Sequence, residues 1–158
     1  MNYSELDRDA HKRFGVLLHE LCEVSGLTQG KLARQAKFER RQLIKNGCIQ
    51  LGTLTGSMEQ PTISRVLAGL QAPTYFQVLI WLRVLRKHYE SEELARICDE
   101  MGIAKPAFTV ETERLLWGLA AFVPPEERAQ AYAQSKDFQP LGFHIPIIEH
   151  KERRMISR

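Results

Sequence analysis

Apolar residues spaced three and four positions apart run through the first 90 residues and predict helices there. The first run predicts a helix over residues 4–24, whose buried face consists of Phe14, Leu17, Leu18 and Leu21. Further runs predict a short helix over 28–36, a third that begins near 60 and a fourth over 74–89. Threonine stands at the start of two of these helices, where its hydroxyl can accept a hydrogen bond from a free backbone N–H.

Residues 37–57 interrupt this pattern. Four basic residues stand here against the single acid Glu39, and glycines recur at 47, 52 and 56. The dipeptide Asn46-Gly47 lies between two short segments, 42–45 and 48–51, which is the arrangement of a hairpin with a tight two-residue turn. The sequence therefore predicts a β-hairpin here, with a long basic loop as the alternative.

The pattern beyond residue 90 is also helical. It predicts helices that begin near residues 91, 109 and 124, the last because Pro124-Pro125-Glu126-Glu127 places proline and acids in a first turn. One short strand is expected over 143–148, followed by a basic tail from Lys151.

Charge is unevenly divided between the two halves. Residues 1–90 hold 13 Lys and Arg against 8 Asp and Glu, a net charge of +5, whereas residues 91–158 hold 9 against 11, a net charge of −2. A basic half suits a polyanion and a slightly acidic half suits a protein partner, although ordinary scatter can produce the same difference.

Composition and motifs disfavour several classes of function. The three cysteines are scattered, the histidines lack ligand spacing, and no Gly-Lys-Ser/Thr follows the glycines. We therefore expect no metal, no cofactor and no enzymatic activity. The polar, acidic N-terminus is unlike a signal peptide, and no run reaches the roughly 18 apolar residues of a membrane helix, so we expect a cytoplasmic protein with no membrane partner.

Two segments of the first half resemble the helix-turn-helix of the Cro/repressor (XRE-type) family. They are Leu27-Thr28-Gln29-Gly30-Lys31-Leu32-Ala33 and Thr62-Ile63-Ser64-Arg65-Val66-Leu67-Ala68-Gly69-Leu70-Gln71-Ala72-Pro73. The resemblance covers about residues 13–88. The chain departs from it in two places: about twenty extra residues, 37–57, separate the segments, and Pro61 stands where relatives often place a base-reading side chain.

The resemblance implies a mainly α fold in two parts. Residues 1–90 would form a Cro/repressor-like helix-turn-helix domain that carries the inserted β-hairpin or basic loop at about 37–57. Residues 91–158 would form a C-terminal helical domain for dimerisation or regulation, with a basic tail.

The same resemblance implies roles in binding double-stranded DNA, because a helix fits the major groove and its first residues reach base edges. Base readout is expected from Gln60, Thr62 and Arg65. Phosphate contacts are expected from Thr28, Gln29, Lys31, Gln71 and Thr74, and further DNA contacts from Arg40, Arg41 and Lys45 in the insertion. The alternatives are a capping role for Thr28, an ordinary surface charge at Arg65 and a solvated face on the insertion.

A homodimer is expected because one such motif reads only a few base pairs. The apolar residues expected to form its interface are Trp81, Leu115, Leu116, Trp117, Phe122 and Val123. The alternative is that these residues pack the two halves of one chain together.

The function expected from the sequence is sequence-specific, DNA-binding transcription regulation. The resemblance favours a phage- or plasmid-type repressor that binds a palindromic operator as a dimer. The alternative is a protein-interaction module that acts as an antitoxin or an inhibitor does, with a partner bound through the C-terminal half.

Overall fold

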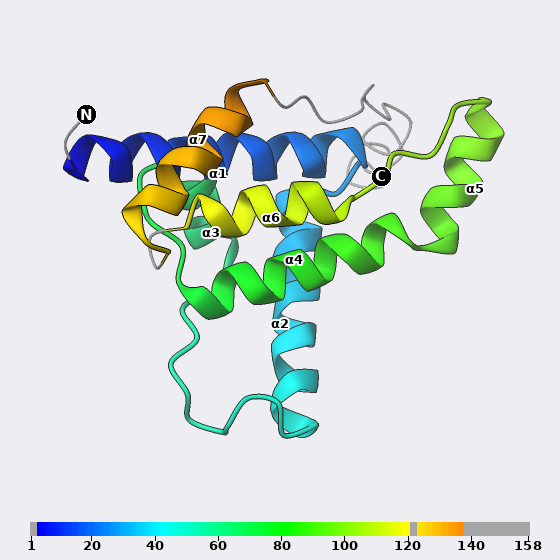
Figure 1. Cartoon of the computed structure of the whole chain (residues 1–158). Helices are drawn as coiled ribbons and strands as arrows, with labels where there is room; N and C mark the ends of the chain where they lie inside the picture. The colour runs from blue at the N-terminus through cyan, green and yellow to red at the C-terminus, as the bar shows by residue number, and fades with distance from the viewer. Residues whose placement is uncertain (1–2, 121–122, 138–158) are drawn as a thin grey trace.

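In the computed structural model, residues 3–120 and 123–137 are described, and this part of the chain consists of α-helices and connecting loops without a strand (Figure 1). The helices are α1 (Tyr3–Val24), α2 (Gln29–Lys45), α3 (Gln60–Leu67), α4 (Tyr75–Tyr89), α5 (Glu92–Met101), α6 (Val110–Gly118) and α7 (Pro125–Asp137). The mainly α prediction is confirmed. The strand expected over 143–148 and the basic tail lie outside the described residues.

The prediction of an inserted β-hairpin is wrong, because α2 continues to Lys45 instead of ending near residue 36. Asn46-Gly47 ends this helix rather than turning a hairpin: Gly47 N donates to Ile44 O at 3.1 Å and Cys48 N donates to Leu43 O at 2.9 Å. That pair of bonds is the Schellman arrangement, and it needs the positive φ of 76° that Gly47 adopts. Residues 46–59 then form a loop that returns to α3.

The capping predictions agree with the structure. The hydroxyls of Thr28 and Thr74 accept hydrogen bonds from Lys31 N and Gln77 N, each at 3.2 Å, at the starts of α2 and α4. Ser91 and Thr109 cap α5 and α6 in the same way. These helix starts follow from local chemistry, because a short polar side chain satisfies a backbone donor that has no partner inside the helix.

One hydrophobic core crosses the boundary expected near residue 90. Its buried members come from α1 to α4 and also from α6 and α7, and they include Phe14, Leu32, Ile63, Trp81, Leu116 and Ala131. The buried residues Leu94, Ile97 and Cys98 of α5 form a smaller separate cluster. The last helices therefore pack on the same core as the first four.

This packing corrects the expected dimer interface. Trp81 and Leu116 are fully buried and Leu115 is 8% exposed within the single chain, so they form no free apolar surface. Trp117 and Val123 are partly buried, and Phe122 lies outside the described residues. For the buried residues, the structure matches the alternative in which they pack the two halves of one chain together.

Three ion pairs, each with one buried partner, tie distant helices to each other. Glu39 of α2 is 3% exposed and contacts Arg83 and Lys87 of α4. Arg128 of α7 is fully buried and contacts Asp7 of α1. Because a buried charge is costly without a partner, each pair fixes how its two helices lie.

The backbones of α1 and α3 approach closely at Gly15. A Cβ added there would lie 2.5 Å from the carbonyl oxygens of Val66 and Leu67, which is closer than atoms can approach. We predict that Gly15→Ala lowers the free energy of unfolding by about 1–3 kcal/mol, because α1 must shift away from the end of α3. Chemical denaturation followed by circular dichroism measures the change.

Gly30→Ala is the matched control, since a Cβ at this helical glycine would meet only side-chain atoms, at 3.6 and 3.8 Å. Alanine is the better helix former, so this variant should be neutral or more stable by up to about 1 kcal/mol. Equal destabilisation of both variants would show that the α1–α3 contact is not as close as described.

A candidate nucleic-acid interface

The N-terminal ends of α2 and α3 lie side by side. A Cβ on Gly30, in the first turn of α2, would lie 3.8 Å from Gln60 Oε1 at the start of α3. One residue before α3, Glu59 forms an ion pair with Lys37, whose Nζ lies 3.2 Å from Glu59 Oε2. The side chains of Ala33 and Ala36 on α2 are buried and small, which allows a neighbouring helix to pack closely.

Helix α3 presents a short polar face. Ile63 and Val66 are buried, whereas Gln60, Ser64 and Arg65 are exposed. Arg65 is held in place: its Nε donates to Gln71 Oε1 at 3.0 Å and its Nη2 to Thr62 Oγ1 at 3.3 Å.

Thr62 requires a correction. It is only 4% exposed, so its hydroxyl does not reach outward as a base-reading group would. Thr62 lies on the buried side of α3 together with Ile63 and Val66. The sequence pattern alone did not show on which side of the helix Thr62 lies. The structure gives Thr62 the role of an acceptor that orients Arg65.

Helix α2 carries an exposed basic stripe made of Arg34, Arg41 and Lys45. Positions seven and four residues apart share one helix face, so this stripe runs along α2. It begins beside α3, because Arg34 Nη1 lies 3.6 Å from the same added Cβ on Gly30 that approaches Gln60. Sequence reasoning missed Arg34, whose link to Arg41 and Lys45 becomes visible only when 29–45 is one helix. Arg40 is partly buried on another side of α2.

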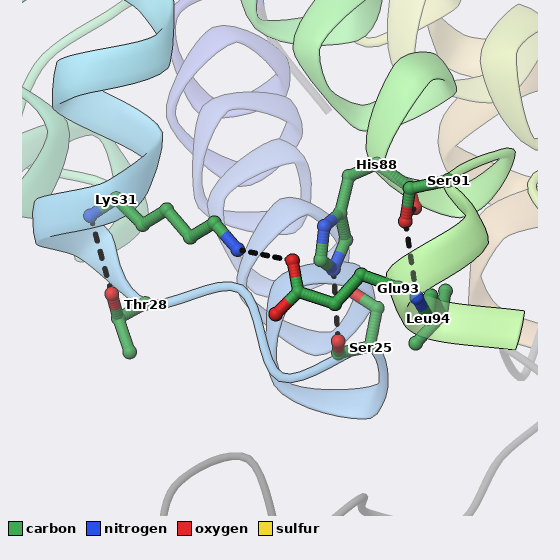
Figure 2. Close-up of polar contacts among 7 residues, drawn as sticks. All are labelled: Ser25, Thr28, Lys31, His88, Ser91, Glu93 and Leu94. Carbon is green, nitrogen blue, oxygen red and sulfur yellow. Dashed lines mark hydrogen bonds and ion pairs between the residues drawn. The ribbon is translucent and has the colours of Figure 1, made fainter. Parts of the chain in front are cut away.

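The residues expected to contact phosphates fall into two groups: some lie at the N-terminus of α2, and the others contact residues elsewhere in the chain. Thr28 and Gln29 lie at the N-terminus of α2, where Thr28 Oγ1 caps the helix. Gln71 is engaged with Arg65, and Thr74 Oγ1 donates to Thr55 O at 2.9 Å while capping α4. The side chain of Lys31 turns toward α5, where its Nζ lies 3.8 Å from Glu93 Oε2 (Figure 2).

A cavity of about 270 Å³ lies beside this ion pair, between α2, α4 and the start of α5. His88 lines it and is buried, and its Nε2 donates to Ser25 O at 2.9 Å (Figure 2). Burial lowers the pKa of His88 below the ordinary value, opposed by the hydrogen bond to Ser25 and by Glu93 and assisted by Lys31. His88 is therefore a neutral hydrogen-bond donor at physiological pH.

Comparison with known proteins gives no match: no family model fits the sequence, no curated protein is similar to it, and no solved structure matches the fold. Within residues 3–120 and 123–137, no helix is long and apolar enough to cross a membrane. The same residues contain no group of three or more His, Cys, Asp or Glu placed to hold a metal ion.

The lowered pKa of His88 predicts how stability depends on pH. An unfolded histidine titrates near 6.5. Below that pH the unfolded chain binds the proton more readily than the folded chain, so stability present above about pH 6.5 is lost as pH falls. We expect His88→Gln to reduce this loss between pH 7.5 and 5.5, by at most about 1.4 kcal/mol per pH unit.

Thermal unfolding across this pH range measures the effect. His11→Gln is the control, because burial also lowers the pKa of His11, which lies beside Asp7 and Arg128, and its removal leaves the His88 contribution in place. The same pH dependence in wild type and His88→Gln would show that His88 is not held neutral by the fold.

Proposed function

We propose that this protein is a sequence-specific, DNA-binding transcription regulator that places α3 in the major groove. The observation that carries the proposal is the juxtaposition of two features: exposed Gln60 and Arg65 on α3, and the basic stripe of Arg34, Arg41 and Lys45 on the neighbouring α2. At Gln60 and Arg34, a group that can read bases therefore lies next to a group that can bind phosphates.

The base-reading part of the proposal concerns the first turns of α3. Guanine offers two acceptors in the major groove to an arginine fork, and adenine offers one acceptor and one donor to a glutamine amide. Arg65 is already oriented by Gln71 and Thr62, so less side-chain entropy is lost when it binds. Gln60 stands at the exposed N-terminal end, which enters the groove first.

The phosphate-binding part concerns α2. Its N-terminus, with Thr28 and Gln29, offers backbone N–H groups and the positive end of the helix dipole. The basic stripe continues from there and can follow a phosphate strand. Lys31 joins this set only if its ion pair with Glu93 opens.

The assembly we propose is a homodimer, because two recognition helices about 34 Å apart would read successive turns of a palindromic operator. The buried positions of Trp81, Leu115 and Leu116 require that a second chain use another face. A repressor of phage or plasmid type is our proposal for the regulatory role, supported by the resemblance of the two segments around Thr28 and Arg65.

Selection of bound sequences from a random duplex pool tests base readout directly, and Arg65→Ala sharpens the test. We expect this variant to lose about 1–3 kcal/mol of discrimination at one base position, the usual worth of a bidentate contact, while non-specific affinity changes little. Arg96→Ala, an exposed arginine on α5, is the control. An equal loss on all sequences would make Arg65 a phosphate contact, and failure to bind any duplex at low salt would refute DNA binding itself.

The basic stripe makes a separate prediction about salt. Replacing Arg34, Arg41 and Lys45 together by glutamine should weaken binding to all duplexes. The slope of log affinity against log salt should shrink by about 0.9 for each phosphate that the variant no longer neutralises. The affinity is measured by fluorescence anisotropy with labelled duplex at salt concentrations from about 50 to about 300 mM.

The matched control removes the same charge elsewhere, by glutamine at the exposed residues Arg96, Lys105 and Arg114. Both triple variants have the same net charge, so an effect of overall charge would appear equally in both. If the salt slope responds equally to the two variants, or to neither, α2 does not follow the DNA backbone.

A further inference from the structure

The loop between α2 and α3 exposes two leucines almost completely. Leu51 is 88% and Leu54 is 95% exposed, the highest values among the large hydrophobic side chains that the structure describes. Leucine gains about 1.5–3 kcal/mol when it is fully buried, so a molecule that covered both leucines of this loop would gain free energy. Their location decides which molecule fits.

The loop is anchored at both ends of this exposed tip. Ile49 is 3% and Met58 is 1% exposed, and both belong to the hydrophobic core. Between Leu54 and Met58, Thr55 O accepts from Thr74 Oγ1 at 2.9 Å and Ser57 O accepts from Gln77 Nε2 at 3.0 Å. The tip, residues 50–54, is thus presented from a fixed base.

The tip lies at the end of an arm that starts beside α3. We define the arm as residues 38–58, which lie between the two partners of the Lys37–Glu59 ion pair. In Figure 1 the second half of α2 extends past α4, and the loop lies at the C-terminal end of α2. From Lys37 to Lys45 the helix rises about 12 Å, which matches the width of about 12 Å of the B-DNA major groove.

We propose that the tip of the arm is an apolar wedge, which inserts Leu51 and Leu54 between base steps of the minor groove beside the major groove that holds α3. This inference rests on the proposed function. If α2 crosses the major groove that holds α3, an arm of this length would bring Arg41 and Lys45 to the flanking phosphate strand and the tip beyond it. Minor-groove proteins use leucine in this way and kink the duplex by about 20–90°.

Charge favours DNA over an apolar protein partner. The exposed cations Arg41 and Lys45 lie on the same arm as the tip, and the residues between Lys45 and the buried Ile49 are uncharged. A protein that covered the two leucines would also have to accommodate these cations, whereas DNA offers phosphates on both sides of the groove that takes the wedge.

The test compares the full chain with the double variant Leu51→Ser and Leu54→Ser on the duplex that the selection identifies. Bending is read from energy transfer between dyes at the duplex ends, and unstacking from 2-aminopurine placed at each step of the flanking minor groove. We expect wild type to bend the duplex and to raise the 2-aminopurine signal at one or two steps. The double variant should lose both signals and about tenfold in affinity.

The salt slope separates this inference from the proposed function. The double variant keeps every charge, so its slope should equal that of wild type. Val110→Ser, an equally drastic change at a residue of α6 that is 65% exposed, is the control and should leave bending unchanged. Unchanged unfolding midpoints show that both variants fold.

Three results would overturn the wedge. If wild type binds its duplex without bending or unstacking it, the wedge is wrong and DNA binding stands. No binding to any duplex refutes both. Retained bending in the double variant, together with loss of self-association or of binding to anionic phosphatidylserine vesicles, would assign the tip to a second copy of the chain or to a lipid surface.

Discussion

A buried carboxylate in the middle of α2 fixes the helix on which the candidate interface depends. Glu39 is 3% exposed and faces Arg83 and Lys87 of α4. Burial alone raises the pKa of a carboxyl, but the hydrogen bonds and charges of Lys87 and Arg83 outweigh it, and the pKa of Glu39 lies below its ordinary value. The acid is therefore charged and paired at physiological pH. Because the side chains of Arg83 and Lys87 are 37% and 60% exposed, the two ion pairs add little net stability and act mainly to orient the helix.

The orientation of α2 determines the positions of both of its ends. Toward its N-terminus the helix brings Gly30 and Arg34 against the start of α3, and toward its C-terminus it carries Lys45 and the loop outward. A 17-residue helix transmits the position of its centre to both ends, whereas a turn and a hairpin would not. The start of α3 thus lies against α2 despite the long insertion relative to the resembled motif, since Glu59 forms an ion pair with Lys37.

The sequence predicted those features that depend on neighbours along the chain. The caps at Thr28 and Thr74 and the buried faces around Leu17 and Ile63 agree with the structure, because each depends on residues within one or two turns. Asn46-Gly47 shows why prediction failed elsewhere. The dipeptide supplies a positive φ that both a hairpin turn and a helix end can use, and the choice is made by Leu43, which is buried in the core as part of α2.

The same reasoning explains the candidate site. Arg65 was predicted because a short motif contains it, whereas Arg34 was missed because its partners Arg41 and Lys45 share its face only in a continuous helix. Leu116 of α6 is buried where α6 contacts α7 and also α1, which lies about 100 residues away in the sequence.

The side chains of α3 and of the arm differ in physical character, and we propose different roles for them in DNA binding. Arg65 and Gln60 offer directional hydrogen bonds, which distinguish one base pair from another but lose much of their energy in giving up water. In the proposed complex, the attraction between the α2 cations and any duplex would weaken with salt, whereas Leu51 and Leu54 would gain free energy that salt hardly changes. Under the proposed function, discrimination between bases, attraction to DNA and bending of DNA would therefore depend on separate side chains. Each of the three should respond to mutation without the other two, provided that the ion pairs of Glu39 keep α2 in place.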